Sequence, residues 1–220
     1  MNNIELVIFD FDGVIADSEH LYTKADIIAF ERSGIEMPLA ERNDIFIGMS
    51  FNQILEILTR RYGSERVVKY RDILPNIVKT LFEKELTAIP NVIEFLTVTN
   101  LPYYVASNAH TNWTKEKIGM MSIDHLFGDI IIGTDSVKNA KPSPDMFELA
   151  AKRAQVDYSK CLVVEDGIYG IHAAKQIDMK VVGFTGQTLH IENHHHKLME
   201  AGAFLTFDCM TKLPEIIRSF

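Results

Sequence analysis

Cysteine is scarce in this chain of 220 residues, which contains only Cys161 and Cys209. Two cysteines do not make a disulfide framework, and Cys161 lies in an apolar run where a small hydrophobic residue is expected anyway. Long hydrophobic runs are also missing, because no segment approaches the roughly 18 uninterrupted apolar residues of a membrane span. No basic leader precedes the first apolar run. We therefore expect a cytoplasmic protein with no membrane partner.

Positive charge is in the minority. The 22 Lys and Arg residues are outnumbered by 30 Asp and Glu residues, which gives a formal net charge of -8. The basic residues are scattered along the chain, whereas a surface for nucleic acid needs them clustered. Nucleic acid is therefore not expected as a partner. The sequence carries no indication of oligomeric state, and we take a monomer as the default.

Hydrophobic residues make up 47% of the chain, enough for one sizeable core and a smaller appended unit. Short apolar runs rich in β-branched and aromatic residues recur along the sequence and are separated by segments with helical periodicity. These runs are Ile4 to Phe9, Tyr103 to Ala106, Ile130 to Ile132, Leu162 to Val164 and Val181 to Phe184. Such alternation predicts an α/β fold, a doubly wound parallel sheet of the Rossmann-like type.

Residues 18–86 contain no convincing strand and several helical faces. The clearest helix is predicted for residues 51–62, with Ser50 capping its start and Gly63 following its last turn. Apolar spacing indicates an earlier helix around residues 21–28 and a later one around residues 77–82. We therefore predict an α/β core formed by residues 1–17 and 87–220, with residues 18–86 inserted as an all-helical cap.

Polar residues follow the apolar runs at the points where each predicted strand ends. In chain order they are Asp10 and Asp12, Ser107 and Asn108, Lys141, and Glu165 and Asp166. Any one of them could simply cap a helix or face solvent, but ligands of open parallel sheets bind outside the carboxyl ends of the strands.

Asp10, Asp12 and Asp166 would repel one another if they converged there. Each contact between like charges costs on the order of 4 kcal/mol at about 4 Å, with an effective dielectric near 20. The cluster therefore needs a cation, and oxygen ligands with room for water and phosphate favour Mg²⁺.

Five short motifs occur in a fixed order: FDFDGV at residues 9–14 with DSE at 17–19, ASN at 106–108, KPSPD at 141–145, and VEDG at 164–167 followed by Gly170. This ordered set resembles the haloacid dehalogenase-like superfamily of phosphohydrolases, and specifically its members with a helical cap inserted after the first strand. The resemblance covers nearly the whole chain. It points to small sugar-phosphate phosphatases, β-phosphoglucomutase-like proteins and phosphoglycolate phosphatases.

The resemblance implies a role for each residue of the core set. Asp10 attacks phosphorus and forms an aspartyl-phosphate, while Asp12 protonates the leaving alcohol and later accepts a proton from water. Ser107, expected at the start of the next helix, and Lys141 bind the phosphoryl group.

The implied metal ligands are Asp10, Asp166 and the backbone carbonyl of Asp12. Glu165 is expected to hold these ligands in place without binding the metal itself.

Contacts with the rest of the substrate are expected from His20, Gly48 and Ser50, near the hinge or on a loop of the cap. Asn108 is a further candidate, which either orients the nucleophile loop or caps the next helix. The three histidines at 194–196 are expected to form a solvated loop rather than a transition-metal site.

Two other readings of the same residues remain open. A phosphomutase would share the whole core, but β-phosphoglucomutase-like sequences have an arginine after Gly-x-Ser where this chain has Phe51, although Arg60 or Arg61 could substitute. A phosphoaspartate signalling or binding domain without turnover is the other alternative. Dehalogenation would leave Asp12 and the Glu165-Asp166 pair unexplained. Hydrolysis of a small phosphorylated metabolite with Mg²⁺ is thus the favoured prediction.

Overall fold

A parallel β-sheet forms the centre of the protein in a computed structural model that describes residues 4–220. The strands lie in the order β3-β2-β1-β4-β5-β6, and every neighbouring pair is parallel. Their bounds are β1 (Leu6–Phe9), β2 (Tyr103–Ala106), β3 (Ile131–Ile132), β4 (Cys161–Glu165), β5 (Lys180–Phe184) and β6 (Thr206–Phe207). The predicted α/β fold is confirmed. The sequence analysis missed β6, whose two residues, Thr206 and Phe207, include only one apolar side chain.

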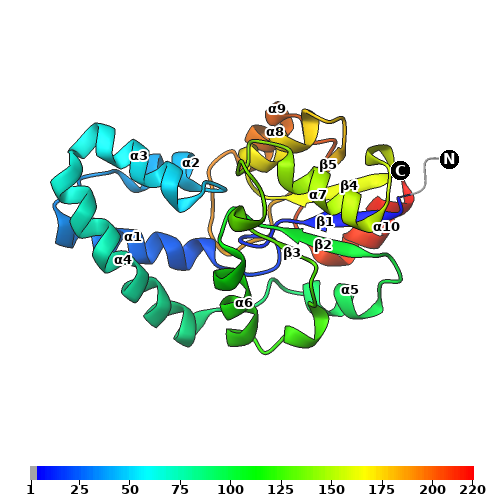
Figure 1. Ribbon diagram of the computed structural model, residues 1–220, viewed down its shortest axis with the longest axis horizontal. Helices are drawn as coiled ribbons and strands as arrows, with labels where there is room; N and C mark the ends of the chain where they lie inside the picture. Colours follow the sequence, from blue (N-terminus) through cyan, green and yellow to red (C-terminus); the bar gives the residue numbers. More distant parts are fainter. Residues whose placement is uncertain (1–3) are drawn as a thin grey trace.

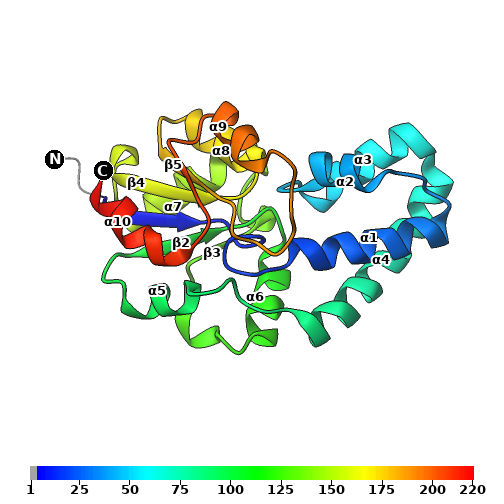
Figure 2. The same cartoon turned by 180° about the vertical axis from the view of Figure 1, so that it is seen from behind.

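Helices cover both faces of the sheet (Figures 1 and 2). In β1, Leu6 and Ile8 pack into one hydrophobic cluster with α7, α8 and α9, while Val7 and Phe9 pack into the other with α5, α6 and α10. Burial on both faces explains why the strands read as continuous apolar runs. The helix bounds are α5 (Val92–Val98), α6 (Thr111–Met120), α7 (Asp145–Ala154), α8 (Ile168–Lys175), α9 (His194–Ala201) and α10 (Leu213–Arg218).

Four helices lie between β1 and α5 in the chain, and we call residues 19–85, which contain them, the helical insert. They are α1 (Glu19–Ser33), α2 (Leu39–Phe46), α3 (Phe51–Tyr62) and α4 (Ser64–Glu85). The strands point their carboxyl ends towards this insert (Figure 1). Helix α3 begins and ends as predicted: Ser50 and Gln53 form a reciprocal capping box, and Gly63 follows the last turn.

The interior of the helical insert is built mainly where α1 packs on α4, and it is continuous with the hydrophobic cluster on one face of the sheet. The rings of Phe30 and Tyr70 stack with centroids 5.3 Å apart. A buried Arg42 donates from Nε to Asp26 (2.8 Å), and the Tyr70 hydroxyl donates to the other oxygen of the same carboxylate (2.7 Å). Burial raises the pKa of Asp26, and Arg42 opposes that rise. Because Asp26 is buried, losing Arg42 would leave its carboxylate without a cationic partner, which typically costs several kcal/mol.

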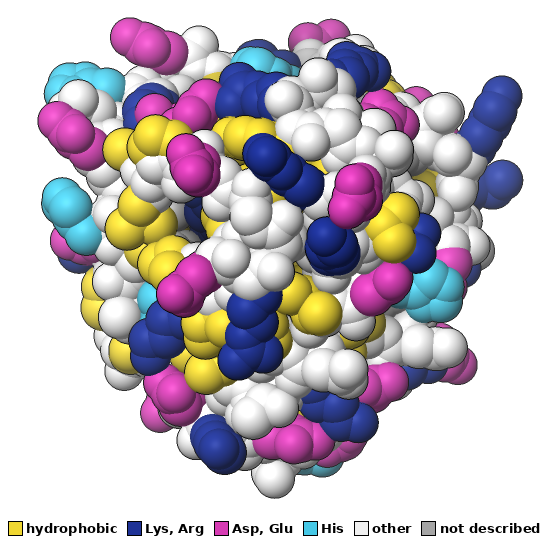
Figure 3. Space-filling model, turned by 90° about the vertical axis from the view of Figure 1, so that its left-hand side faces the viewer, with side chains coloured by type: hydrophobic (Ala, Val, Ile, Leu, Met, Phe, Trp, Pro, Cys, Tyr) yellow, Lys and Arg dark blue, Asp and Glu magenta, His cyan; other side chains and the backbone are white. Residues whose placement is uncertain are grey.

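The outer face of the helical insert carries charges of both signs. Figure 3 shows Lys and Arg side chains interspersed with Asp and Glu side chains on this face. Some of them pair one helical turn apart, as Lys69 does with Glu65 on α4 (3.1 Å), which is typical of a solvated helix surface. None of the helices within residues 4–220 is both long and apolar enough to span a membrane.

Candidate active site

The carboxyl ends of β1, β2 and β4 bring the predicted site residues together. Asp10 directly follows β1, Ser107 follows β2, and Glu165 ends β4 with Asp166 next in the chain. Because β1 lies between β2 and β4, these ends meet where the direction of strand addition reverses. The backbone N–H of Asp10 donates to the carbonyl of Val164 (2.9 Å), which anchors the first aspartate to β4.

Lys141 reaches into this site from the loop before α7. Its Nζ lies 2.7 Å from Asp10 Oδ1, donates to Glu165, and donates to the carbonyl oxygen of Ala106 (2.7 Å). The side chain is 2% exposed. Burial alone would lower the pKa of Lys141, but the carboxylates of Asp10 and Glu165 raise it above its usual value, so the amine carries its charge. The structure therefore places a permanent cation beside the predicted nucleophile.

The carboxylates of Asp10, Glu165 and Asp166 form a compact acidic cluster, with one oxygen of each within 4.8 Å of the others. Both oxygens of Asp166 are buried and accept no hydrogen bond from the residues that the structure describes. Burial, followed by the charges of Glu19 and Asp10, raises the pKa of Asp166 well above its usual range. Burial also raises the pKa of Glu165 to about 7, against the lowering effect of Lys141. A buried carboxylate without a partner, in a set of oxygen donors, fits a hard divalent cation.

A family model of haloacid dehalogenase-like hydrolases matches residues 7–184, a range that includes all of these residues. The chain belongs to this family. It is 27% identical over all 220 residues to 6-phosphogluconate phosphatase of Escherichia coli (strain K12), covering 97% of that protein. It is 28% identical to phosphorylated carbohydrates phosphatase of Thermotoga maritima, over 91% of this chain and 92% of the relative. The crystal structure of a haloacid dehalogenase-like protein from Agrobacterium tumefaciens has a TM-score of 0.85 and 26% identity over 99% of each chain.

The second aspartate of this haloacid dehalogenase-like hydrolase has partners of its own outside the acidic cluster of Asp10, Glu165 and Asp166. Asp12 accepts hydrogen bonds from the Ser18 hydroxyl (2.7 Å) and from Lys117, whose Nζ lies 2.6 Å from Oδ1 and also contacts Oδ2. The Asp12 side chain is 16% exposed. Binding of a metal by the backbone carbonyl of Asp12 stays a prediction.

Asn108 links two loops of the site. Its side-chain oxygen accepts from the Lys141 backbone N–H (2.9 Å), and its amide donates to the carbonyls of Gly48 (2.8 Å) and Lys141 (3.2 Å). These contacts go to the loops of Gly48 and Lys141 and not to the nucleophile loop, and the N-cap of α6 is His110, so neither of the two predicted structural roles describes them. Direct contact between Asn108 and substrate stays a prediction.

Gly48 brings the helical insert against the end of β4. A Cβ added at Gly48 would lie 3.4 Å from the Cα of Gly167, and the Gly48 backbone has a φ of +76°. Gln53 of α3 adds a second link by donating to the Lys141 carbonyl (3.2 Å). These two contacts join the insert to the loop after β4 and to the loop before α7.

The other predicted contact residues have local partners. The Ser107 hydroxyl accepts from the Ala109 N–H (3.1 Å), and the expectation that Ser107 starts the next helix was wrong, because α6 begins four residues later. Ser50 is engaged in the capping box of α3. His20 Nδ1 lies 3.5 Å from Asp17. None of these contacts tests substrate binding, which stays a prediction for Ser107, His20 and Ser50.

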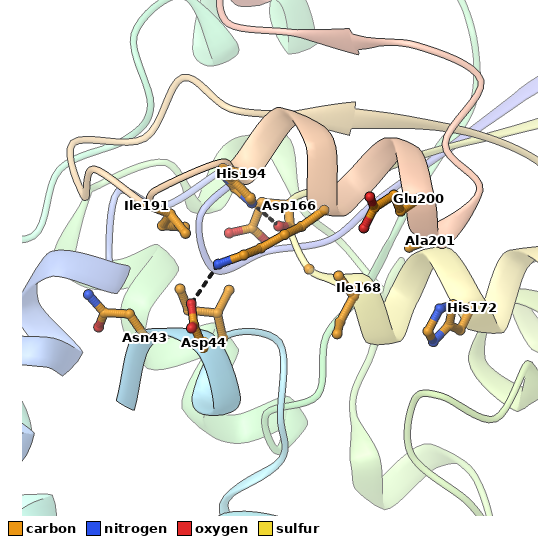
Figure 4. Close-up of a pocket in the computed structure, with 12 residues that line it drawn as sticks. Asn43, Asp44, Asp166, Ile168, His172, Ile191, His194, Glu200 and Ala201 are labelled. Atoms are coloured by element: carbon orange, nitrogen blue, oxygen red, sulfur yellow. Dashed lines mark hydrogen bonds and ion pairs between the residues drawn. The ribbon is translucent and has the colours of Figure 1, made fainter. Parts of the chain in front are cut away.

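The three histidines at 194–196 are not a loop, as we had expected, but the first turn of α9. His194 is held by a contact of 2.7 Å between its Nε2 and the carbonyl oxygen of Asp166 (Figure 4). This contact anchors α9 beside the acidic cluster, a position that sequence periodicity did not indicate. A pocket of about 300 Å³ lies between α2 of the insert and helices α8 and α9. Figure 4 shows Asn43, Asp44 and Asp166 among its lining residues.

Gly13 allows Asp166 to approach the first loop. Its φ is +78°, and a Cβ at this position would lie 1.9 Å from Asp166 Oδ2. Gly170 serves Glu165 in the same way, because an added Cβ would lie 1.7 Å from Glu165 Oε1. The two glycines of the motifs are therefore required by close packing around the acidic cluster.

We expect Gly13→Ala to lower both stability and hydrolytic activity, because alanine strains the backbone and displaces Asp166. Gly63→Ala is a matched control, since Gly63 also has a positive φ (+82°) but has nothing within 4 Å of an added Cβ. The control should lose about 1–2 kcal/mol from backbone strain alone, and Gly13→Ala about 1–3 kcal/mol more from overpacking. Thermal unfolding and steady-state activity measure both effects. Equal destabilisation of the two variants with full activity would contradict this role of Gly13.

Sequence reasoning missed two charged residues of the site, Lys117 and Glu19. Glu19 belongs to the DSE motif but had been given no role of its own. Its carboxyl group is buried, and burial, partly offset by Arg42, raises its pKa to about 7, with Asp12 and Asp10 contributing. Lys117 lies on α6 one helical turn after Trp113 and directly before Ile118, and it belongs to none of the motifs of the sequence analysis.

Proposed function

We propose that this hydrolase is a cytoplasmic, Mg²⁺-dependent phosphatase that cleaves small phosphomonoesters, sugar phosphates above all, through an aspartyl-phosphate on Asp10. The observation that carries the proposal is the position of the Asp10 carboxylate. It lies between the amine of Lys141 at 2.7 Å and the carboxylate of Asp166, which has no hydrogen-bond partner within residues 4–220. A nucleophile for phosphorus needs such surroundings, where positive charge compensates the incoming phosphate.

In the first step Asp10 attacks phosphorus as the bond to the leaving oxygen breaks, and Asp12 gives its proton to that oxygen. In the second step water attacks phosphorus and gives a proton to Asp12, the bond from phosphorus to Asp10 breaks, and inorganic phosphate leaves. Ser107 and Lys141 hold the phosphoryl oxygens throughout. Mg²⁺, held by Asp10, Asp166 and the carbonyl oxygen of Asp12, with Glu165 supporting these ligands, would neutralise charge on the phosphate.

The helical insert would serve as a cap that excludes water while Asp10 attacks. In this proposal residues 1–17 and 87–220 form the catalytic core and residues 18–86 the cap. The contacts of Gly48 and Gln53 with the core support this division, because they join the insert to the loops that carry Lys141 and Asp166.

A phosphorylated sugar suits the pocket of Figure 4. The pocket adjoins Asp166, and its lining includes several polar side chains, among them Asn43, His194 and Lys197. Hydroxyl groups of a sugar need such donors and acceptors. The names of the two bacterial relatives, 6-phosphogluconate phosphatase and phosphorylated carbohydrates phosphatase, point to the same class.

Phosphate release from a panel of phosphomonoesters tests the proposal. We expect turnover with Mg²⁺ on phosphorylated sugars or sugar acids, 6-phosphogluconate included, at a higher kcat/KM than on nucleotides. Product analysis distinguishes the alternatives. An isomerised sugar phosphate would indicate a mutase, and a stable phosphoprotein without turnover a signalling domain. The Asp10→Asn protein, purified in parallel, controls for contaminating phosphatases.

A further inference from the structure

Lys117 is a fully buried lysine, with 0% of its side chain exposed, and its carboxylate partner is Asp12. The amine contacts both oxygens of that carboxylate, which otherwise accepts only from Ser18 in the structure of residues 4–220. Burying an ammonium group is costly unless it is paired. The pair therefore constrains both partners, and the orientation of the Asp12 carboxylate depends on where Lys117 is held.

Aromatic side chains surround the amine on its remaining sides. Nζ lies 4.7 Å from the ring centroid of Phe11, 5.7 Å from Tyr22 and 6.0 Å from Trp113. The Tyr22 hydroxyl is 3.4 Å from Nζ and accepts a hydrogen bond from Trp113 Nε1 (3.0 Å). The faces of aromatic rings attract an ammonium group but carry no net negative charge, so they do not replace Asp12 as its ionic partner. These rings hold the lysine in place and leave Asp12 as its charged partner.

The aromatic group connects the helical insert to the sheet. Tyr22 belongs to α1, and Phe82 of α4 packs edge-on against it at 4.9 Å. Phe82 also stacks at 5.8 Å on Trp113, which lies on α6 one helical turn before Lys117. The two long helices of the insert therefore meet the core at Lys117, and a movement of the insert displaces the groups that hold this lysine.

Lys117 is separate from the cation of the phosphate site. Lys141 contacts Asp10 and Glu165, whereas Lys117 contacts Asp12. Each of the two aspartates of the first motif thus has its own buried lysine, and the two lysines come from different parts of the chain.

We propose that Lys117 is the positioning residue of Asp12. It holds the Asp12 carboxylate where this group can exchange a proton with the leaving oxygen, and it couples the position of the carboxylate to the helical insert. This inference rests on the proposed function, in which Asp12 acts as acid and base. In the step concerned, the bond from phosphorus to Asp10 forms, the bond to the leaving oxygen breaks, and the proton of Asp12 moves to that oxygen. A mispositioned Asp12 slows this step only where the leaving oxygen needs the proton.

The dependence on the leaving group separates positioning from a general structural role. The leaving group of glycerol phosphate is a glycerol alkoxide, which requires protonation. The leaving group of dinitrophenyl phosphate is a stable dinitrophenolate, which does not. The quantity to compare is kcat/KM, because it reports the steps up to formation of the aspartyl-phosphate.

For Lys117→Met we expect kcat/KM to fall about 100-fold on glycerol phosphate, the usual contribution of general acid catalysis, and less than about 3-fold on dinitrophenyl phosphate. Lys115→Met, an exposed position on the same helix, is the matched control and should leave both values unchanged. If Lys117→Met does not fold, Tyr22→Phe replaces it. Tyr22→Phe removes one contact of the amine and should give a smaller loss confined to glycerol phosphate.

Equal losses on both substrates, or no loss on glycerol phosphate, would overturn the positioning role of Lys117 while leaving the proposed function standing. A wild-type enzyme that releases phosphate from neither substrate would overturn the proposed function, and this inference with it.

Discussion

The Asp10→Asn enzyme is expected to release phosphate at least about 10⁴-fold more slowly than wild type, the scale on which removal of a nucleophile acts. The amide has nearly the shape of the carboxylate but cannot attack phosphorus. Lys141 keeps its contacts with Glu165 and the Ala106 carbonyl in this variant, so we expect the fold to persist. Steady-state phosphate release and thermal unfolding measure the two outcomes.

Asp208→Asn is a suitable control for that experiment, because Asp208 is an exposed aspartate that pairs only with Lys212 at the surface. It should retain full activity. Acid-quenched wild type incubated with substrate should carry phosphate on the peptide that contains Asp10, and the variant should not. If Asp10→Asn retained more than about a tenth of the wild-type rate, far above what loss of a nucleophile permits, direct attack by water would replace the covalent mechanism.

Removal of divalent metal is expected to silence the enzyme, and addition of Mg²⁺ to restore it. The physical reason is the mutual repulsion of Asp10, Glu165 and Asp166, whose oxygens lie within 4.8 Å of one another. A cation that binds the folded state also stabilises it, by about 2.7 kcal/mol at a hundred times its dissociation constant. For a chain of this size that corresponds to an increase in Tm of about 5–10 °C. Activity and thermal unfolding with and without Mg²⁺ measure the two effects.

The Asp166→Asn variant distinguishes the effect of metal binding from the effect of Asp166 on the stability of the fold. Without Mg²⁺ this protein should be at least as stable as wild type, because one buried charge without a hydrogen-bond partner in the described structure has been removed. With Mg²⁺ it should show little further stabilisation and little activity. Full activity of wild type in excess chelator, or an equal response of both proteins to Mg²⁺, would contradict a metal site at Asp166.

Much of the site could be predicted because it depends on local pattern. Asp10 and Ser107 each come directly after an apolar run, and Asp166 comes one residue later, after Glu165. The carboxyl ends of parallel strands lie at one edge of a sheet, so these residues were expected to meet. Lys141 could be predicted only through the order of the motifs and the family they resemble. The structure places its amine against Asp10, a contact between residues 131 positions apart in the chain.

Other features could not be predicted, for different physical reasons. The turn of α9 at His194 is held partly by the carbonyl of Asp166, a contact across 28 residues that no local pattern records. Asn108 contacts the loops of Gly48 and Lys141, and the path of these loops is not contained in the pattern around Asn108. Lys117 belongs to none of the motifs, and its contact with Asp12 spans 105 residues, so no local pattern records this pairing.

Sequence patterns were enough to predict the alternation of strands and helices, the start and end of α3, and the set of acidic strand ends, because each depends on the spacing of residues within a short segment. The pairing of Asp12 with Lys117, 105 residues away, and of Asp10 with Lys141 emerges only from the folded arrangement. The reason is geometric. Which charges meet in a buried site depends on how α6 and the helical insert pack against the sheet, and packing of distant segments is not contained in the pattern of any one of them.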